Sequence, residues 1–167
     1  MNATLNKPVL YTTCPSPLGQ LLLAGDEDAL RALHLPNRHA RGGDWVSAEQ
    51  PFARAVEQLE EYFAGERRTF QLPLAASGTP FEEAVWDALS AIPYGETRSY
   101  GEVARAVGRP DRARAVGSAN ARNPLAIIVP CHRVIGSDGS LTGYGGGLER
   151  KQALLALEQG AWQQSLL

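Results

Sequence analysis

The segment Ala75-Ala76-Ser77-Gly78-Thr79-Pro80 divides the chain into two halves with different apolar patterns. Before this segment, short apolar runs alternate with turn residues, which indicates β-strands. After it, apolar residues recur mostly at the spacing of α-helices. We therefore expect an α/β (α+β) fold, with a small sheet-plus-helix domain over residues 1–76 and a mostly helical domain over residues 77–167.

In the first half, strands are expected where an apolar run is bounded by turns. Such runs cover residues 9–11, 20–24 and 30–35, and residues 70–74 are a candidate edge strand. A helix is expected over residues 51–63, where apolar side chains recur at helical spacing. The polar residues 37–50 are expected to form a loop.

In the second half, capping residues mark the start of two helices. Thr79 before a proline is typical of an N-cap, so a helix should run from there to residue 92. Ser99 with Glu102 three residues later has the pattern of a capping box, which predicts a short helix as far as Val107.

A tight turn then joins two helices. Gly108-Arg109-Pro110 breaks the helix that follows Ser99, and Asp111 is the expected cap of a further helix that ends near Ala121. A helix, a short turn and a second helix at this spacing are typical of a helix-turn-helix. A last long helix is expected over residues 147–158.

Composition limits the classes of protein to which the chain can belong. Hydrophobic residues make up 44% and charged residues 20%, as in soluble globular proteins. No apolar run approaches the ~20 residues that span a bilayer, and the N-terminus has no signal-peptide pattern. Cys14 and Cys131 are the only cysteines and make no disulfide framework. We expect a cytoplasmic protein with no membrane partner.

The net charge of −2 hides an uneven distribution of charge along the chain. Residues 92–133 hold seven arginines against three acidic residues, whereas both flanking segments are net negative. A local cationic segment is typical of a protein that binds a polyanion such as nucleic acid. The alternative is an ordinary solvated helical face.

The motif Pro130-Cys131-His132-Arg133-Val134 carries the clearest chemistry, and an apolar, strand-like run over Ile127-Ile128-Val129 leads into it. A thiol beside an imidazole is a candidate nucleophile, because the base can take its proton and raise the share of thiolate. Glu158 is the candidate carboxylate that orients the base. The alternatives are a hydrogen-bonded core histidine for His132 and a solvent-exposed helical glutamate for Glu158.

The helix expected before this motif is rich in small residues: Ala113, Ala115, Gly117, Ser118, Ala119 and Ala121. Tight helix packing is one interpretation. A recognition helix in the major groove is another, although such helices normally carry long side chains that read base edges. A helix of small residues also fits a widened minor groove. Arg114 is then a candidate either to fill the space of an extruded base or to contact a phosphate.

The glycine-rich segment Gly143–Gly147 surrounds Tyr144 and lacks the lysine and hydroxyl residue of a phosphate loop. It fits a backbone that approaches a flat ligand, with Tyr144 as a stacking wall, and the alternative is a mobile hairpin. No metal and no cofactor are expected. Cys14, His34 and His39 lack a convincing fourth zinc ligand, and adjacent cysteine and histidine are not typical ligand spacing.

These residues resemble the methylated-DNA–protein-cysteine methyltransferase family, the O6-alkylguanine-DNA alkyltransferases. The resemblance is strongest between Pro93 and Glu158 and rests on several separate motifs. The motifs are Pro93-Tyr94-Gly95-Glu96-Thr97-Arg98-Ser99-Tyr100, Arg114-Ala115-Val116-Gly117, Asn123-Pro124, Ile127 through Gly136, and Leu141 through Leu148. Residues 1–75 resemble the family only in the order of elements and in Ser16-Pro17-Leu18-Gly19.

The resemblance implies a role for each site residue. Cys131 would accept the alkyl group, His132 would relay its proton through a water toward Glu158, Asn123 would brace the turn before the active site, and Tyr100 would help rotate the nucleotide and protonate the purine. The implied DNA-binding residues are Arg114, Ala113, Ala115, Gly117, Ser118, Arg122 and Arg133. The implied base pocket consists of Tyr100, Val134, Tyr144 and Gly145. The family often has serine at the position of Gly145, so only a backbone N–H is expected to donate there.

The resemblance implies direct-reversal DNA repair by a monomer that needs no cofactor. The alkyl group would pass from O6 of guanine, and from O4 of thymine, in double-stranded DNA to Cys131 after the base is flipped from the minor groove. The thioether has no route back, so each molecule would act once. Two alternatives remain at this point: a hydrolase that uses Cys131, His132 and Glu158, and a non-catalytic protein that binds alkylated DNA.

Overall fold

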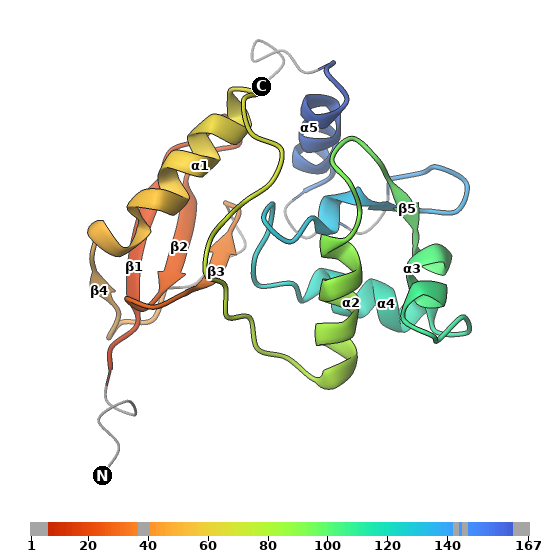
Figure 1. The fold of residues 1–167 in the computed structure, drawn as a ribbon, viewed down its shortest axis with the longest axis horizontal. Helices are drawn as coiled ribbons and strands as arrows, with labels where there is room; N and C mark the ends of the chain where they lie inside the picture. The colour runs from red at the N-terminus through yellow and green to blue at the C-terminus, as the bar shows by residue number, and fades with distance from the viewer. Residues whose placement is uncertain (1–6, 37–40, 142–143, 145–146, 162–167) are drawn as a thin grey trace. The chain divides into compact units, whose positions relative to one another are not determined.

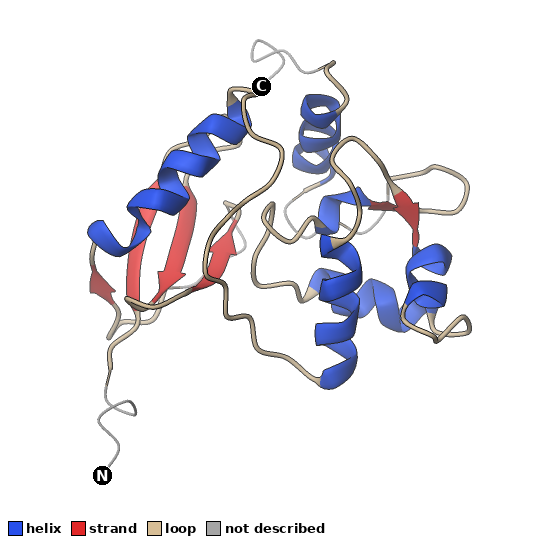
Figure 2. Ribbon diagram, viewed as in Figure 1, coloured by secondary structure: helices blue, strands red, loops and turns tan. Residues whose placement is uncertain are grey.

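The computed structural model describes residues 7–36, 41–141, 144 and 147–161, and it divides into two compact units, Met1–Ala76 and Ser77–Leu167. Strands lie mainly in the first unit and helices mainly in the second (Figure 2). The expected mixed fold, with a small sheet followed by a helical part, is therefore confirmed.

The first unit is a four-stranded sheet with one helix along it (Figure 1). Its elements are β1 (Leu10–Cys14), β2 (Leu21–Gly25), β3 (Leu30–His34), β4 (Val46–Ser47), the 3-10 helix η2 (Gln50–Phe52) and α1 (Ala53–Phe63). The strand order is β3-β2-β1-β4, with β1 and β3 antiparallel to β2 and β4 parallel to β1. All five residues of the interior strand β2 are buried.

Two details of the first unit differ from the sequence prediction. The loop expected over residues 37–50 contains β4, whose two residues are both exposed and leave no alternating pattern to recognise. The edge strand expected over residues 70–74 is wrong, because only a single bridge joins Leu74 to Leu30. The side chain of Gln58 on α1 instead binds the backbone of Gln71, donating to its carbonyl at 3.1 Å and accepting from its N–H at 2.9 Å.

The described part of the second unit contains four α-helices, one 3-10 helix and two short parallel strands. Its elements are α2 (Pro80–Ser90), β5 (Arg98–Ser99), α3 (Tyr100–Ala106), α4 (Ala113–Ala121), the 3-10 helix η3 (Cys131–Arg133), β6 (Val134–Ile135) and α5 (Leu148–Glu158). The strands β5 and β6 pair in parallel. Fully buried side chains from several elements form the core: Val85, Leu89, Val116, Leu125, Ile127, Val134 and Leu154. The buried indole of Trp86 donates to the carbonyl of Ala119 at 2.9 Å, which ties α2 to α4.

Two of the three predicted N-cap residues are correct. Thr79 caps α2 and Ser99 caps α3, each by a complete capping box with a glutamate three residues later. The prediction for Asp111 is wrong. Helix α4 begins two residues later, and its N-cap residue Arg112 makes no side-chain capping bond.

The apolar run before Cys131 is not a strand but a series of turns. Ile127 has φ 71°, in the left-handed region that β-branched residues rarely adopt, so the chain cannot stay extended there. Asn123 supplies the hydrogen bonds that a partner strand would have given. Its amide donates to the carbonyls of Val129 at 2.8 Å and Leu125 at 3.4 Å, and its oxygen accepts from the N–H of Leu125 at 3.0 Å.

Candidate active site

Cys131 opens η3, the single turn that follows this loop. Its side chain is buried, and its backbone N–H donates to the carbonyl of Val129 at 2.8 Å. On the other side, Asn120 of α4 donates its amide to the carbonyl of Cys131 at 3.3 Å. The thiol is thus fixed between the loop that Asn123 braces and the last turn of α4.

His132 and Glu158, predicted from separate parts of the sequence, meet in the core of the second unit. The imidazole Nε2 lies 2.8 Å from Oε2 of Glu158, and both side chains are almost fully buried. Glu158 is therefore not the solvent-exposed helical residue of the alternative interpretation. Glu158 lies in the last turn of α5 and contacts the turn that carries the thiol.

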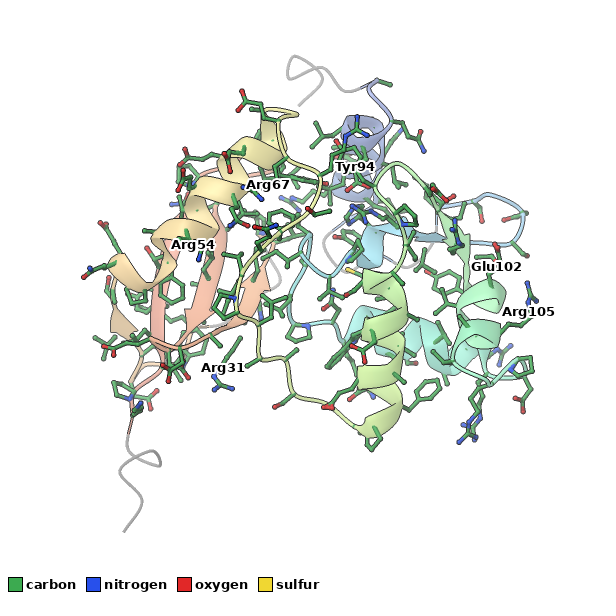
Figure 3. All side chains as sticks on the ribbon, viewed as in Figure 1. Arg31, Arg54, Arg67, Tyr94, Glu102 and Arg105 are labelled. Carbon is green, nitrogen blue, oxygen red and sulfur yellow. The ribbon has the colours of Figure 1, made fainter. Side chains whose placement is uncertain are left out.

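Arg133 also binds Glu158, and this arrangement corrects its predicted role. Its Nε donates to Oε1 at 2.7 Å, its Nη2 donates to Oε2 at 2.9 Å, and its Nη1 donates to the carbonyl of Ile92 at 2.7 Å. Its guanidinium also lies 5.7 Å from the ring centroid of Tyr94, which Figure 3 labels. A buried guanidinium with these partners is not available as a DNA contact.

The arrangement of hydrogen bonds around Glu158 sets the tautomer of His132. A carboxylate held by a two-pronged guanidinium is ionised and only accepts hydrogen bonds. Nε2 of His132 must then carry the hydrogen, which leaves Nδ1 with a lone pair. Burial lowers the pKa of His132, and Glu158 only partly opposes this effect. The resting imidazole is therefore a neutral base.

Burial has the opposite consequence for the thiol. It raises the pKa of Cys131, although hydrogen bonds from Asn123 and Tyr144 and the charge of Lys151 act to lower it. The expectation of a raised resting share of thiolate is thus wrong. The buried sulfur keeps its proton at rest, and the thiolate has to be generated during the reaction.

Lys151 is a site residue that the sequence did not reveal. Its side chain is fully buried, and its Nζ donates to the carbonyl of Val134 at 2.6 Å and lies 5.8 Å from the ring centroid of Tyr144. Burial lowers the pKa of Lys151, and the nearby Cys131 raises it in part. The residue stands in a charged first turn that looks solvent-exposed. The available signal was its spacing of seven from Glu158, which places both on one helix face.

The predicted recognition helix α4 presents Arg114 and Ser118, four residues apart, as exposed side chains, while Gly117 is half-buried. Among the described residues, no hydrogen bond or ion pair reaches the guanidinium of Arg114. Tyr100, at the start of α3, lies beside this helix. A methyl group added at Gly117 would be 3.8 Å from a carbon of its ring.

The seven arginines of residues 92–133 fall into two groups. Arg133 is buried, Arg122 pairs with Glu82 at 3.3 Å, and Arg98 pairs with Glu96 at 3.0 Å. The other four are exposed and form no ion pair with a described residue: Arg105, Arg109, Arg112 and Arg114. These four lie on α3, on the turn and on α4 (Figure 3 labels Arg105). We call them the helix-turn-helix arginines.

The remaining predicted residues take the following places. Val134 is fully buried beside the thiol turn, Tyr144 is half-buried near Lys151, Ala113 and Ala115 are half-buried on α4, and Gly145 lies outside the described residues. A groove of about 480 Å³ between α2 and α3 is lined by Arg105 but by none of the predicted site residues. Within the described ranges, no group of three or more histidine, cysteine, aspartate or glutamate side chains could hold a metal, and no helix is long and apolar enough to cross a membrane. His39 lies outside those ranges.

Comparisons with known proteins agree with this geometry. Residues 80–160 match the sequence profile described as 6-O-methylguanine DNA methyltransferase, DNA binding domain, and residues 9–76 match that of the ribonuclease-like domain of the same enzyme. The chain is 55% identical to the methylated-DNA–protein-cysteine methyltransferase of Mycolicibacterium paratuberculosis, over 89% of this chain and 92% of the relative. It is 51% identical to the constitutive enzyme of Bacillus subtilis, over 89% of this chain and 94% of the relative.

A solved structure extends the likeness to the fold. The crystal structure of Mycobacterium tuberculosis OGT in complex with DNA superposes with a TM-score of 0.89 at 52% identity, covering 94% of this chain and 97% of that one. Both profiles together span nearly the whole chain, and the relatives match over most of their own length. The chain belongs to the methylated-DNA–protein-cysteine methyltransferase family.

Proposed function

We propose that the protein repairs DNA directly, by moving an alkyl group from O6 of guanine in double-stranded DNA to Cys131. O4 of thymine is a second acceptable position. The observation that carries this proposal is the buried thiol at the start of η3, next to a neutral His132 that Glu158 orients, in the unit that also carries the helix-turn-helix. We further propose that the protein acts as a monomer in the cytoplasm.

The reaction moves one alkyl group from guanine to the sulfur, one proton from the thiol to His132 and one proton onto guanine. The thiol proton leaves Cys131 toward His132, and the sulfur lone pair forms a bond to the alkyl carbon while the carbon–O6 bond breaks. The electron pair of that bond stays on guanine, which takes up one proton and leaves as a neutral base. Tyr100, which lies beside α4, is the donor that we propose for that proton, and solvent restores it as His132 gives up its own extra proton. A thioether is not hydrolysed, so each molecule acts once.

Access to O6 requires that the alkylated nucleotide leave the base stack. Half-buried small side chains let α4 approach the minor groove closely, and the exposed Arg114 is the side chain long enough to occupy the vacated space. The helix-turn-helix arginines supply the charge that holds the phosphate backbone.

Replacement of the sulfur tests this proposal directly. Cys131→Ser keeps the size of the side chain but lacks a soft nucleophile, so methyl transfer from an O6-methylguanine duplex should vanish while affinity for that duplex persists. Loss of transfer and of affinity together would contradict the proposal, because it assigns affinity to the arginines. A Cys-His-Glu hydrolase would turn over many times, and a pure binding protein would never become alkylated.

A further inference from the structure

Asn120 is a buried amide whose oxygen has no hydrogen-bond partner among the described residues. It lies in the last turn of α4, is 3% exposed, and donates Nδ2 to the carbonyl of Cys131 at 3.3 Å. Because a carbonyl only accepts, the NH2 group must face Cys131 and the oxygen Oδ1 must point away from that carbonyl. Oδ1 is nevertheless fully buried and accepts no hydrogen bond from any residue that the structure describes.

Nδ1 of His132 is a second buried atom of this kind, and it adjoins the same cysteine. Since Nε2 gives its hydrogen to Glu158, Nδ1 is a hydrogen-bond acceptor. Two buried acceptors therefore belong to residues that adjoin Cys131: one residue binds its carbonyl, and the other follows it in the chain. The thiol of Cys131 is a donor.

One water molecule matches this set of groups. Its two hydrogens satisfy the two acceptors, and its oxygen accepts the S–H of Cys131. Buried waters in proteins typically make about three hydrogen bonds to polar groups that would otherwise lack partners. A side chain could satisfy these atoms only by supplying two donors and one acceptor at one point.

We propose that Oδ1 of Asn120 is the second anchor of the water through which Cys131 passes its proton to His132. This inference deepens the proposed function and rests on Cys131 being the alkyl acceptor. It makes Asn120 a positioning residue of the reaction.

The second anchor fixes the direction of proton transfer. With both hydrogens engaged by Nδ1 and Oδ1, the water turns its lone pairs toward the thiol and can only accept from it. The thiol proton then moves to the water as one water proton moves to Nδ1 of His132, and the water is regenerated. With Nδ1 alone, the water could rotate and donate to the sulfur, which would block the transfer.

Other contacts of the sulfur are compatible with this arrangement. The side chains of Asn123 and Tyr144 act to lower the pKa of the thiol, which favours the thiolate that forms. Among the described residues, the charged or titratable groups that face Cys131 and His132 are Glu158 and Lys151 on α5, Arg133 on η3, and Tyr144. None of these groups donates a hydrogen bond to Oδ1 of Asn120.

The test is Asn120→Leu, a change that keeps the approximate shape of the side chain and removes both polar atoms. Single-turnover transfer from an O6-methylguanine duplex is measured from pH 7 to 8.5. The wild-type rate should be nearly level, because neutral His132 takes the proton. The variant should be about tenfold slower or more at pH 7, and its rate should climb by about tenfold per pH unit because the thiol must first ionise into solvent.

Gln58→Leu is the matched control in the first unit. Gln58 is also a buried amide, but both of its polar atoms are bonded to Gln71. Its loss should lower the thermal midpoint and leave the transfer rate unchanged at a temperature where the variant is folded. Asn120→Leu should show the reverse, with a loss of rate out of proportion to any fall in the thermal midpoint, because leucine keeps the buried volume of the side chain.

The outcomes separate this inference from the proposed function. A variant with the wild-type rate and profile, or one slowed equally at every pH, overturns the role of Asn120. If neither Asn120→Leu nor Asn120→Met folds, the role is also overturned, because the amide would then be needed for the fold. A wild-type protein that carries no methyl group on Cys131 would instead defeat the proposed function itself.

Discussion

The guanidinium of Arg133 grips the carboxylate of Glu158 with two parallel hydrogen bonds, 2.7 and 2.9 Å long, in the core of the second unit. The same carboxylate receives the imidazole of His132 at 2.8 Å. The positive charge of Arg133 therefore neutralises the negative charge of Glu158, and His132 need not be protonated to do so. This balance explains how a buried histidine next to a carboxylate remains neutral and able to accept a proton.

Breaking this pair should cost both stability and activity. Arg133→Met leaves an uncompensated buried carboxylate and should lower the free energy of unfolding by about 3–5 kcal/mol. The double change Arg133→Met with Glu158→Leu should recover much of that loss, because a well-packed apolar pair can replace a buried ion pair. Chemical denaturation measures both.

The double variant also separates stability from chemistry. It should still transfer methyl groups slowly, since His132 has lost the carboxylate that fixes its tautomer. Recovery of the full transfer rate in the double variant would show that Glu158 has no part in the reaction.

Stability should decrease at acid pH because of His132. Burial lowers the pKa of His132 in the folded protein. Below about pH 6.5, His132 takes up a proton in the unfolded chain but not in the folded protein. The free energy of unfolding therefore falls as the pH falls toward the lowered pKa. The thermal midpoint of His132→Gln should decline less steeply than that of the wild type between pH 6.5 and 5. Gln58→Leu replaces a buried side chain of the first unit that does not titrate, and it is the control that should keep the wild-type decline.

Arg114 should matter for duplex DNA and not for the free base. Arg114→Ala removes the side chain that fills the vacated space in the stack, and unstacking costs a few kcal/mol, so transfer from an O6-methylguanine duplex should slow strongly. Transfer from free O6-alkylguanine needs no flipping and should change little. Equal losses on both substrates would indicate a defect in folding.

The helix-turn-helix arginines should set the salt dependence of binding. Arg109→Gln and Arg112→Gln should each reduce the slope of log affinity against log salt by roughly 0.9, if each side chain neutralises one phosphate. Arg31→Gln is the control, because Arg31 lies in the first unit and pairs with Asp26 at 2.9 Å. A slope that responds to Arg31 and ignores the other two would contradict the assignment.

The used protein should be less stable than the fresh protein. A methyl group on the buried sulfur of Cys131 gains at most about 0.8 kcal/mol of burial, whereas overpacking a filled site typically costs about 1–3 kcal/mol. The thermal midpoint of the methylated protein, free of DNA, should therefore fall. An unchanged or raised midpoint would mean that the pocket has spare volume.

The sequence predicted those parts of the fold that local rules determine. The capping boxes at Thr79 and Ser99 could be predicted because each involves two residues that are only three apart in the chain. The turn at Ile127 was missed because an apolar, β-branched run predicts a strand. The backbone after this turn is instead bonded by the side chain of Asn123, which donates to the carbonyl of Val129. Local periodicity contains no record of that bond.

The candidate site was predicted unevenly for a similar reason. Motifs and resemblance were enough to name Cys131, His132 and Glu158, which the fold brings together. Charge alone could not tell that Arg133 faces inward, nor that Lys151 is fully buried, because a charged residue in a helix or turn is normally exposed. Both depend on contacts between residues far apart in the chain: Arg133 binds Glu158, and Lys151 binds the carbonyl of Val134.

The stoichiometry of methyl transfer tests the central claim most directly. Labelled O6-methylguanine duplex is given in excess to a known amount of protein, and the label is counted and located by peptide mapping. The account predicts a plateau at about one methyl group per chain, all of it on Cys131, since a thioether provides no route back to the thiol. Continued turnover, or label on Cys14, would contradict it.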